Sequence, residues 1–268
     1  PVWGPYADLL AKVPHLVLVE HNTRERYTRW RLAQSRWLAA RTSRIVGCSE
    51  GVRQALLDMR MPAGRTIAIP NGVRLEPFAE ADAHPYASRM PGIVMVSRLS
   101  KQKDHPTLLR ALALLRDRGL QPPLLLAGGG KRAHRRPLEK LIVELGLQSQ
   151  VSLLGVVRNV PELLMGHQLA VLSTHYEGMP LALIEGMAAG CAVVGSAVPG
   201  VREVLVDGVD GRLVPESDPV ALADALEALL RDPAQAAQLA AAARRKALQH
   251  HGRELMNQRY EELFLSLV

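Results

Sequence analysis

The chain has 268 residues, an apolar fraction of 48% and a formal net charge of +7. This length suits two domains of ordinary size, and the composition is that of a globular protein, which excludes a disordered chain. No apolar run approaches the roughly 20 residues that span a bilayer, and no signal-peptide pattern opens the chain, so we expect a cytoplasmic protein.

Much of the basic excess lies between residues 24 and 44, in RERYTRWRLAQSRWLAARTSR, where Tyr27, Trp30 and Trp37 recur at helical spacing beside arginines. Three interpretations remain open. The segment is a surface helix whose aromatic residues pack inward, a patch that contacts an anionic membrane at its inner face, or a nucleic-acid site. Because no nucleic-acid-binding motif accompanies the charge, we expect no nucleic-acid partner.

Short apolar runs alternate with longer amphipathic stretches along the chain. The expected strands are residues 15–20, 44–49, 65–70, 92–98, 123–129, 151–157, 169–174 and 191–196. Between them, stretches such as DHPTLLRALALLRDRG repeat leucine at three and four residues, which is typical of helices that cover a sheet. The alternation of strand and helix predicts an α/β protein with parallel sheets.

The same pattern divides the chain. Residues 76–91, EPFAEADAHPYASRMP, contain three prolines and no sustained period, which predicts a linker between two domains. The α/β pattern is complete after this segment, whereas only two or three strands precede it. We therefore place a partial first domain at residues 1–80, the linker at 81–91, a second domain at 92–250 and a C-terminal helix at 251–268.

The stretch HYEGMPLALIEGMAAG points to an anion site. Gly178 suits a tight turn, Pro180 suits the first helical position and Gly190 suits a helix end. The free backbone N–H groups of residues 178–181 would face a ligand beyond the carboxyl end of the preceding strand. Glu185 follows among apolar residues, where a carboxylate needs a partner. It is either a salt-bridged structural residue or a binding group for vicinal hydroxyls, such as those of ribose.

Two further strand ends carry polar or flexible loops. In SRLSKQKD, Arg98 and Lys103 stand between a strand and a helix that opens near Asp104. They are either solvated surface charges or a pair that holds a diphosphate, the arginine by its fork and the lysine as a point charge. In AGGGKR, the glycines around Gly129 would let a ligand approach the backbone closely, although the loop lacks the spacing of known phosphate-binding motifs.

Taken together, these residues resemble a known family. The pair Glu177 and Glu185, followed by GCAVVGSAVPGVREVLVDGVDGRLV, is similar to the retaining glycosyltransferases of family 4, or glycosyl transferases group 1. IPNGV, SRLSKQKD, LLLAGGGKR and VSLLGVV match further family blocks in the same order. The resemblance runs from about Val17 to the C-terminus, and it implies a GT-B fold of two Rossmann-like domains with parallel sheets, the first one truncated.

The resemblance also implies roles for the phosphate side of the site. Arg98 and Lys103 would hold the diphosphate of a nucleotide-sugar donor and stabilise the leaving phosphate, which is electrostatic catalysis by preorganised cations. The backbone of Gly178, Met179, Pro180 and Leu181 would meet the phosphates. We therefore expect no metal and no other cofactor.

For the rest of the donor, the resemblance implies that Glu177 contacts sugar hydroxyls and that Glu185 takes the ribose. The backbone around Val157 and Arg158 would receive the base, for which uridine is favoured over guanosine. His21 in the first domain lies near a family position that lines the sugar from the opposite side, and a structural role for it stays open. The last helix would return to pack on the first domain.

The expected activity is transfer of a sugar from a nucleotide-sugar to an acceptor hydroxyl with retention of configuration, in glycan, polysaccharide or glycolipid biosynthesis. Two alternatives remain, a nucleotide-sugar-binding remnant and another GT-B enzyme such as a sugar-nucleotide epimerase. The sequence departs from the family at two points. The opening strand and glycine-rich loop of the first domain do not precede Pro1, which predicts a fragment or processed chain, and Ser97 stands where the family often has glycine.

Overall fold

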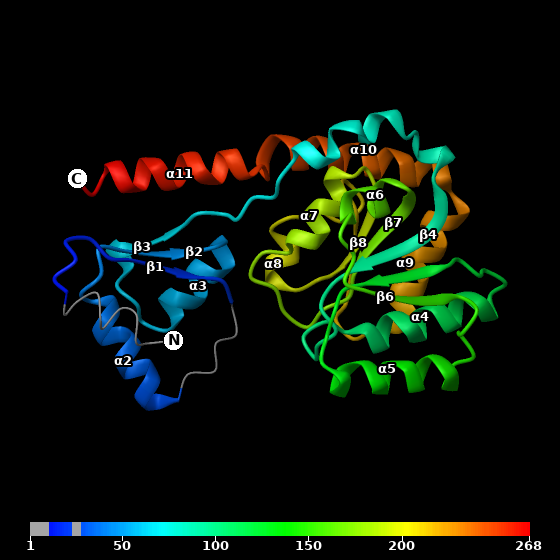
Figure 1. Ribbon diagram of the computed structural model, residues 1–268, viewed down its shortest axis with the longest axis horizontal. Helices are drawn as coiled ribbons and strands as arrows, with labels where there is room; N and C mark the ends of the chain where they lie inside the picture. Colours follow the sequence, from blue (N-terminus) through cyan, green and yellow to red (C-terminus); the bar gives the residue numbers. More distant parts are fainter. Residues whose placement is uncertain (1–10, 23–27) are drawn as a thin grey trace. The chain divides into compact units, whose positions relative to one another are not determined.

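A computed structural model of the chain describes residues 11–22 and 28–268. The backbone forms two units, each built on its own parallel sheet (Figure 1). Unit 1 comprises the described residues up to Gly72, together with Tyr176–Met179 and Arg253–Val268, and unit 2 comprises Val73–His175 and Pro180–Gly252. The predicted α/β architecture with parallel sheets is therefore confirmed.

Unit 1 has a three-stranded sheet in the order β1-β2-β3. Its strands are β1 (Val17–Glu20), β2 (Arg44–Gly47) and β3 (Thr66–Ala68), and its helices are α2 (Arg29–Ala39), α3 (Glu50–Asp58), the 3₁₀ turn η1 (Ala63–Arg65) and α11 (Arg253–Leu265). Helix α3 begins where Ser49 accepts a hydrogen bond from the N–H of Val52, the usual N-cap arrangement. All three strands fall within ranges that the sequence predicts.

Two apolar clusters stabilise unit 1. Successive residues of a strand point to opposite faces of the sheet. Ile45 accordingly belongs to one cluster, with Cys48 and Leu56, and Val46 belongs to another, with Ile69 and Leu263 of α11. Met256 and Tyr260 of α11 pack against the second cluster, whereas Phe264, which the sequence pattern places on the same helix face, is 51% exposed. The C-terminal helix thus covers one face of the unit 1 sheet.

Unit 2 has a six-stranded sheet in the order β6-β5-β4-β7-β8-β9. The strands are β4 (Met90–Val96), β5 (Leu124–Ala127), β6 (Val151–Gly155), β7 (His167–Leu172), β8 (Ala192–Ser196) and β9 (Arg212–Val214). The helices are α4 (His105–Asp117), α5 (Arg132–Glu144), α6 (Val160–Met165), α7 (Leu181–Ala188), α8 (Pro199–Arg202), α9 (Pro219–Arg231) and α10 (Pro233–His250). The strand β9 is additional to the sequence prediction.

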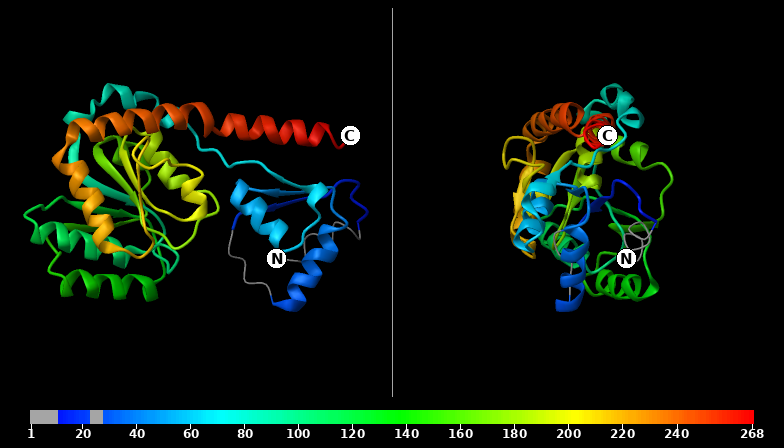
Figure 2. Two further views of the ribbon diagram at one scale, coloured as in Figure 1. Left: turned by 180° about the vertical axis from the view of Figure 1, so that it is seen from behind. Right: turned by 90° about the vertical axis from the view of Figure 1, so that its left-hand side faces the viewer.

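The order of the strands creates a switch point in unit 2. The chain runs from β4 outward to β6, then returns to β7 and runs outward to β9, so the direction reverses between β4 and β7. Helices α4 and α5 cover one face of this sheet, and α7 and α10 cover the other (Figure 1, Figure 2). Open α/β sheets bind ligands beyond the carboxyl ends of the strands at such a point.

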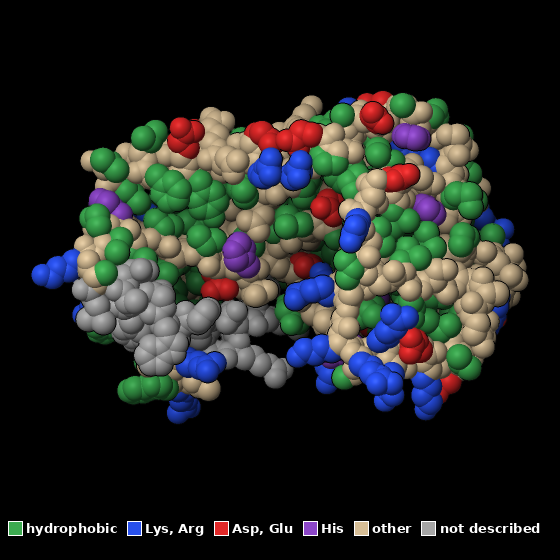
Figure 3. Space-filling view, viewed as in Figure 1, with side chains coloured by type: hydrophobic (Ala, Val, Ile, Leu, Met, Phe, Trp, Pro, Cys, Tyr) green, Lys and Arg blue, Asp and Glu red, His purple; other side chains and the backbone are tan. Residues whose placement is uncertain are grey.

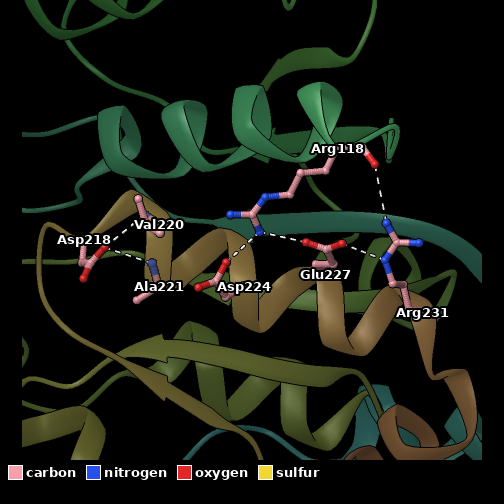
Figure 4. A network of polar contacts seen from close by, with 7 residues as sticks. All are labelled: Arg118, Asp218, Val220, Ala221, Asp224, Glu227 and Arg231. Carbon is pink, nitrogen blue, oxygen red and sulfur yellow. Dashed lines mark hydrogen bonds and ion pairs between the residues drawn. The ribbon is translucent and has the colours of Figure 1, made fainter.

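Burial in the core of unit 2 explains why the sequences of its strands are continuous apolar runs. Ile93, Val94 and Met95 of β4 are completely buried, because the sheet is covered on both faces. An ion-pair network closes the far end of α4 against α9, where Arg118 bonds to Asp224 and Glu227 (Figure 4). The network thus links the C-terminal end of α4 to α9.

Residues 76–91 are ordered differently from the irregular linker that the sequence predicts. They form the 3₁₀ helices η2 (Glu76–Ala83) and η3 (Tyr86–Ser88) and the start of β4. Phe78 is 2% exposed, and Arg89 donates hydrogen bonds to the carbonyls of Ala189 and Gly190 just after α7. Because Phe78 is buried and Arg89 satisfies these end carbonyls, the segment is part of unit 2.

Candidate functional site

The carboxyl edge of the unit 2 sheet gathers the predicted residues of that unit. Arg98 and Lys103 lie in the loop that follows β4, Gly129 follows β5, and Val157 and Arg158 follow β6. Pro180, Leu181 and Glu185 stand at the start of α7 and along it, after β7. Parallel strands end at one edge of a sheet, which is why residues up to 87 positions apart in sequence collect there.

The structure explains why glycines are needed in the loop that follows β5. Gly128 has a φ of +150°, and a Cβ atom there would lie 1.9 Å from the carbonyl oxygen of Ser97. At Gly130 a Cβ atom would lie 2.7 Å from the carbonyl oxygen of Leu99. The loop after β4 therefore occupies the space that side chains would need. The sequence analysis expected a ligand to approach these glycines closely. At Gly128 and Gly130 the protein's own backbone makes that close approach.

Helix α7 ends before Gly190, as the sequence predicts, but it begins at Leu181, one residue after the expected first helical position. Pro180 occupies the N-cap position of α7 and supplies no side-chain hydrogen bond, so the first N–H groups have no side-chain cap. The helix stops at Ala188, and Gly190 has a φ of +76°, the left-handed conformation that glycine adopts most readily.

Glu185 is a partly buried carboxylate that has no partner among the described residues. Burial raises the pKa of its carboxyl above the ordinary value. In residues 11–22 and 28–268, no side chain forms an ion pair or a hydrogen bond with this carboxylate. The salt-bridged structural glutamate that the sequence left open is therefore not what the structure shows. Its carboxylate is available to hydroxyl donors from a ligand.

The remaining predicted residues belong to unit 1. Glu177 is 5% exposed, and a Cβ atom at Gly178 would lie 2.0 Å from the carbonyl oxygen of His21, so only glycine fits there. Met179 packs against the cluster that contains Cys48. His21 follows β1, and its Nδ1 lies 3.4 Å from the Nδ2 of Asn71. Packing in unit 1 thus requires glycine at position 178, where the sequence predicts a tight turn.

A cavity of about 400 Å³ adjoins the loop after β4. Its walls are formed by residues of that loop, the starts of α4 and α5, and His175. Lys103 is the one predicted donor residue in the described lining, while Arg98 and Glu185 are not part of it. Lys and Arg side chains gather on the neighbouring surface over α5 (Figure 3), so the basic excess is not confined to residues 24–44.

Polar residues that the sequence reasoning missed hold this loop. His105 is 4% exposed and contacts both Ser97 and Lys103, and His175 lies 3.0 Å from a carboxylate oxygen of Glu216. A histidine directly after the helix-capping Asp104 was the available signal. It was passed over because a lone histidine has no fixed role by sequence alone.

The part of the chain that the structure describes contains no cluster of side chains suited to bind a metal ion. Within residues 11–22 and 28–268, no group of three or more His, Cys, Asp or Glu side chains is arranged to hold a metal ion. Over the same residues, no helix combines the length and apolar character needed to cross a membrane.

Helix α2 carries the basic and aromatic segment. Trp30 is 74% exposed and Trp37 is 45% exposed, so the interpretation in which these tryptophans pack inward is wrong. The guanidinium carbon of Arg41 lies 3.8 Å from the centre of the Trp37 ring, a cation–π contact. Tyr27 lies outside the described residues.

The fold and the edge of the unit 2 sheet define a class of protein. Two α/β units, each with a parallel sheet, fit the GT-B fold, and solved glycosyltransferase structures confirm this expected fold. The family model "Glycosyl transferases group 1" matches residues 80–246, and "Glycosyltransferase Family 4" matches residues 1–77. The chain belongs to the glycosyl transferases group 1 family.

Among curated proteins, the chain is similar to the D-inositol 3-phosphate glycosyltransferase of Geodermatophilus obscurus, with 33% identity over 262 residues, covering 90% of this chain and 56% of the relative. It is also similar to the putative glycosyltransferase EpsD of Bacillus subtilis, with 27% identity over 223 residues, covering 80% of this chain and 58% of the relative. The chain therefore spans about half the length of the curated relatives it matches.

Solved structures share the fold. Sucrose-phosphate synthase from Thermosynechococcus elongatus has a TM-score of 0.83 and 27% identity, over 99% of this chain and 72% of that one. Anabaena HepE, crystallised in complex with UDP-glucose, has a TM-score of 0.88 and 24% identity, over 98% of this chain and 75% of that one.

Proposed function

We propose that this chain carries the donor-binding half of a retaining glycosyltransferase that uses a nucleotide-sugar, with UDP-sugars favoured over GDP-sugars. The observation that carries the proposal is Glu185, a half-buried carboxylate on the helix after β7. Its pKa is raised, and residues 11–22 and 28–268 supply it with no partner. A carboxylate in this position is stabilised when a pair of hydroxyls donates to it, and the ribose of a nucleotide supplies that pair. The UDP-glucose complex of HepE supports the same donor chemistry.

The proposed reaction breaks the bond between the anomeric carbon of the sugar and the terminal phosphate oxygen. The oxygen of an acceptor hydroxyl takes its place on the same face of the sugar. The hydroxyl proton passes to the departing phosphate oxygen, and the nucleoside diphosphate leaves. Arg98, Lys103 and the uncapped N-terminus of α7 would stabilise the charge that develops on the diphosphate. Glu177 would orient the sugar, and the backbone near Val157 and Arg158 would meet the base. His21 stays a candidate for contact with the sugar. The acceptor would belong to glycan, polysaccharide or glycolipid biosynthesis.

Donor binding should not depend on a metal ion, because two cations and a helix N-terminus can neutralise the diphosphate. We expect calorimetric titration with UDP to give the same affinity with and without EDTA, and with and without added Mg²⁺. GDP in a parallel titration should bind more weakly. If chelation abolished binding and Mg²⁺ or Mn²⁺ restored it, the assignment of Arg98 and Lys103 to the diphosphate would be wrong. If neither nucleotide bound, the proposed function itself would fail.

Helix α2 supports a second element of the proposal, which is peripheral contact with the inner face of a membrane. Its exposed tryptophans and arginines combine interfacial aromatic groups with attraction to anionic lipids.

We expect the chain to sediment with vesicles of phosphatidylglycerol and phosphatidylcholine, and the double change of Trp30 and Trp37 to Ser should lower the bound fraction about fivefold or more. Raising the salt to about 0.5 M should release the protein as well, since salt screens charge attraction. Phe264→Ala is the matched control, because Phe264 is an exposed aromatic residue on another helix of the same unit. Equal binding by both variants would remove α2 from the membrane contact.

A further inference from the structure

The first half of the loop after β4 is bonded to the strand end on one side. The N–H of Ser97 donates to the carbonyl of Ala127 at 2.9 Å, and the N–H of Leu99 donates to the carbonyl of Gly129 at 2.8 Å. These bonds continue the pairing of β4 with β5 beyond both strands. Arg98 lies between the two bonded residues, so its backbone position follows the end of β5.

The second half of the loop is bonded to the strand end on the other side. The N–H of His175 donates to the carbonyl of Gln102 at 2.9 Å, and the N–H of Asp104 donates to the carbonyl of Ser173 at 3.0 Å. Both partners follow β7, and β4 lies between β5 and β7 in the sheet. Lys103 stands between Gln102 and Asp104, so its backbone position follows the end of β7.

His105 joins the two halves. Its Nε2 lies 3.0 Å from the hydroxyl oxygen of Ser97, and its Nδ1 lies 2.8 Å from the carbonyl oxygen of Lys103. The side chain is 4% exposed, so these contacts are made without competition from solvent. One ring therefore bridges the residue before Arg98 and the backbone of Lys103, across the point where the strand order reverses.

The contacts select one form of the ring. A carbonyl oxygen only accepts hydrogen bonds, so Nδ1 carries the proton that is donated to Lys103. Burial lowers the pKa of His105 and outweighs the hydrogen bond to the Lys103 carbonyl, which raises it, so the neutral ring is the form present at neutral pH. Its Nε2 then accepts the hydroxyl proton of Ser97. The serine that departs from the family's glycine thus has a specific partner.

We propose that His105 is a positioning residue that holds Arg98 and Lys103 in register for one diphosphate, with Ser97 as its partner. This inference rests on the proposed function. Two cations can hold one diphosphate only at a fixed separation, and their backbones are anchored to strands on opposite sides of β4. The His105 bridge limits relative movement of the two anchors. Ser97 and His105 therefore determine donor affinity without touching the donor.

The test compares variants that break one bond or both. Ser97→Ala removes the hydroxyl, and His105→Asn keeps an N–H near the position of Nδ1 while losing the acceptor at Nε2. Each should weaken UDP binding about three- to tenfold by calorimetry, the usual worth of one neutral hydrogen bond. The double variant should bind UDP no more weakly than whichever single variant binds it more weakly, because both changes remove the same hydrogen bond. His105→Phe, which loses both bonds, should bind more weakly than His105→Asn.

Leu112→Val is the matched control, because Leu112 is completely buried in α4 and lies two turns from the loop. It should lower the melting temperature without changing UDP affinity, which separates positioning from a general loss of stability. Long-range ¹H–¹⁵N spectra supply a second measurement. The His105 ring should show a protonated Nδ1 and an accepting Nε2, and Ser97→Ala should shift the Nε2 resonance with little change at Nδ1.

The outcomes separate this inference from the proposed function. UDP affinities of Ser97→Ala and His105→Asn equal to that of the unaltered chain would overturn the positioning role and leave the donor site standing. Additive effects in the double variant, or a ring protonated at Nε2 alone, would also overturn it. Absence of UDP binding in the unaltered chain would instead contradict the donor assignment, and the spectra would still report whether the bridge exists.

Discussion

Glu185→Gln should weaken UDP binding about 10- to 150-fold while the chain keeps its fold. The carboxylate is expected to accept the ribose hydroxyls, and a hydrogen bond to a charged group contributes about 1.5–3 kcal/mol. The variant should also lose the discrimination between UDP and 2′-deoxy-UDP, because Gln offers a weaker acceptor to the same hydroxyls. Calorimetry with both nucleotides measures the affinity and the discrimination together.

The stability of the same variant should change in the opposite direction. Burial raises the folded-state pKa of Glu185 above the unfolded value, so the ionised carboxylate opposes folding once the pH exceeds the unfolded pKa of about 4.5. Gln removes this cost, so the melting temperature at neutral pH should stay equal or rise, and the difference from the unaltered chain should shrink as the pH falls toward 4.5.

Glu144→Gln is the control, because Glu144 is a surface residue of α5 paired with Lys140. It should change neither the UDP affinity nor the melting temperature appreciably. A Glu185→Gln variant with a large loss of stability and unchanged UDP affinity would show that the carboxylate serves the fold and not a ligand.

Gly128→Ala should destabilise unit 2 by at least about 3 kcal/mol. Its φ of +150° is a conformation that side chains rarely adopt, and the added Cβ would lie 1.9 Å from the carbonyl oxygen of Ser97. The carbonyl is held by backbone and cannot move away as a flexible side chain could. Urea unfolding monitored by circular dichroism would measure the loss.

Gly119→Ala is the matched variant for this test. Gly119 also has a positive φ, of +81°, but no atom lies within 4 Å of the position of its Cβ. It should therefore cost about 1 kcal/mol, from backbone strain alone. Similar losses for the two variants would mean that the loops after β4 and β5 separate more easily than their contacts indicate.

Much of the fold could be predicted from the order of the residues. Apolar runs separated by amphipathic stretches predicted eight strands, each of which overlaps an observed strand. Helix ends could also be predicted from the sequence, because Asp104, Pro180 and Gly190 act through local backbone chemistry. Strand β9 was missed because it is defined by its pairing with β8, which the local sequence does not show.

The linker prediction shows the opposite case. Prolines and a missing period in residues 76–91 predicted a linker, but they gave no information about burial. Phe78 and Arg89 are fixed by partners about 100 residues or more away, including the carbonyls at the end of α7 and the side chain of Arg244. Contacts of this kind depend on which surfaces meet in the folded chain, so a local pattern cannot reveal them.

The sequence by itself determined the α/β class, the positions of the strand-end loops and the residue types that suit an anionic ligand, because these depend on short-range periodicity and side-chain chemistry. Only the tertiary structure decided that Glu185 has no partner in the part of the chain that the structure describes, that Gly128 makes room for Ser97, and that His105 bridges Ser97 and Lys103. The reason is physical: partners, clashes and burial arise where separate strand ends meet at one edge of a sheet, and the sheet order β5-β4-β7 sets which ends those are.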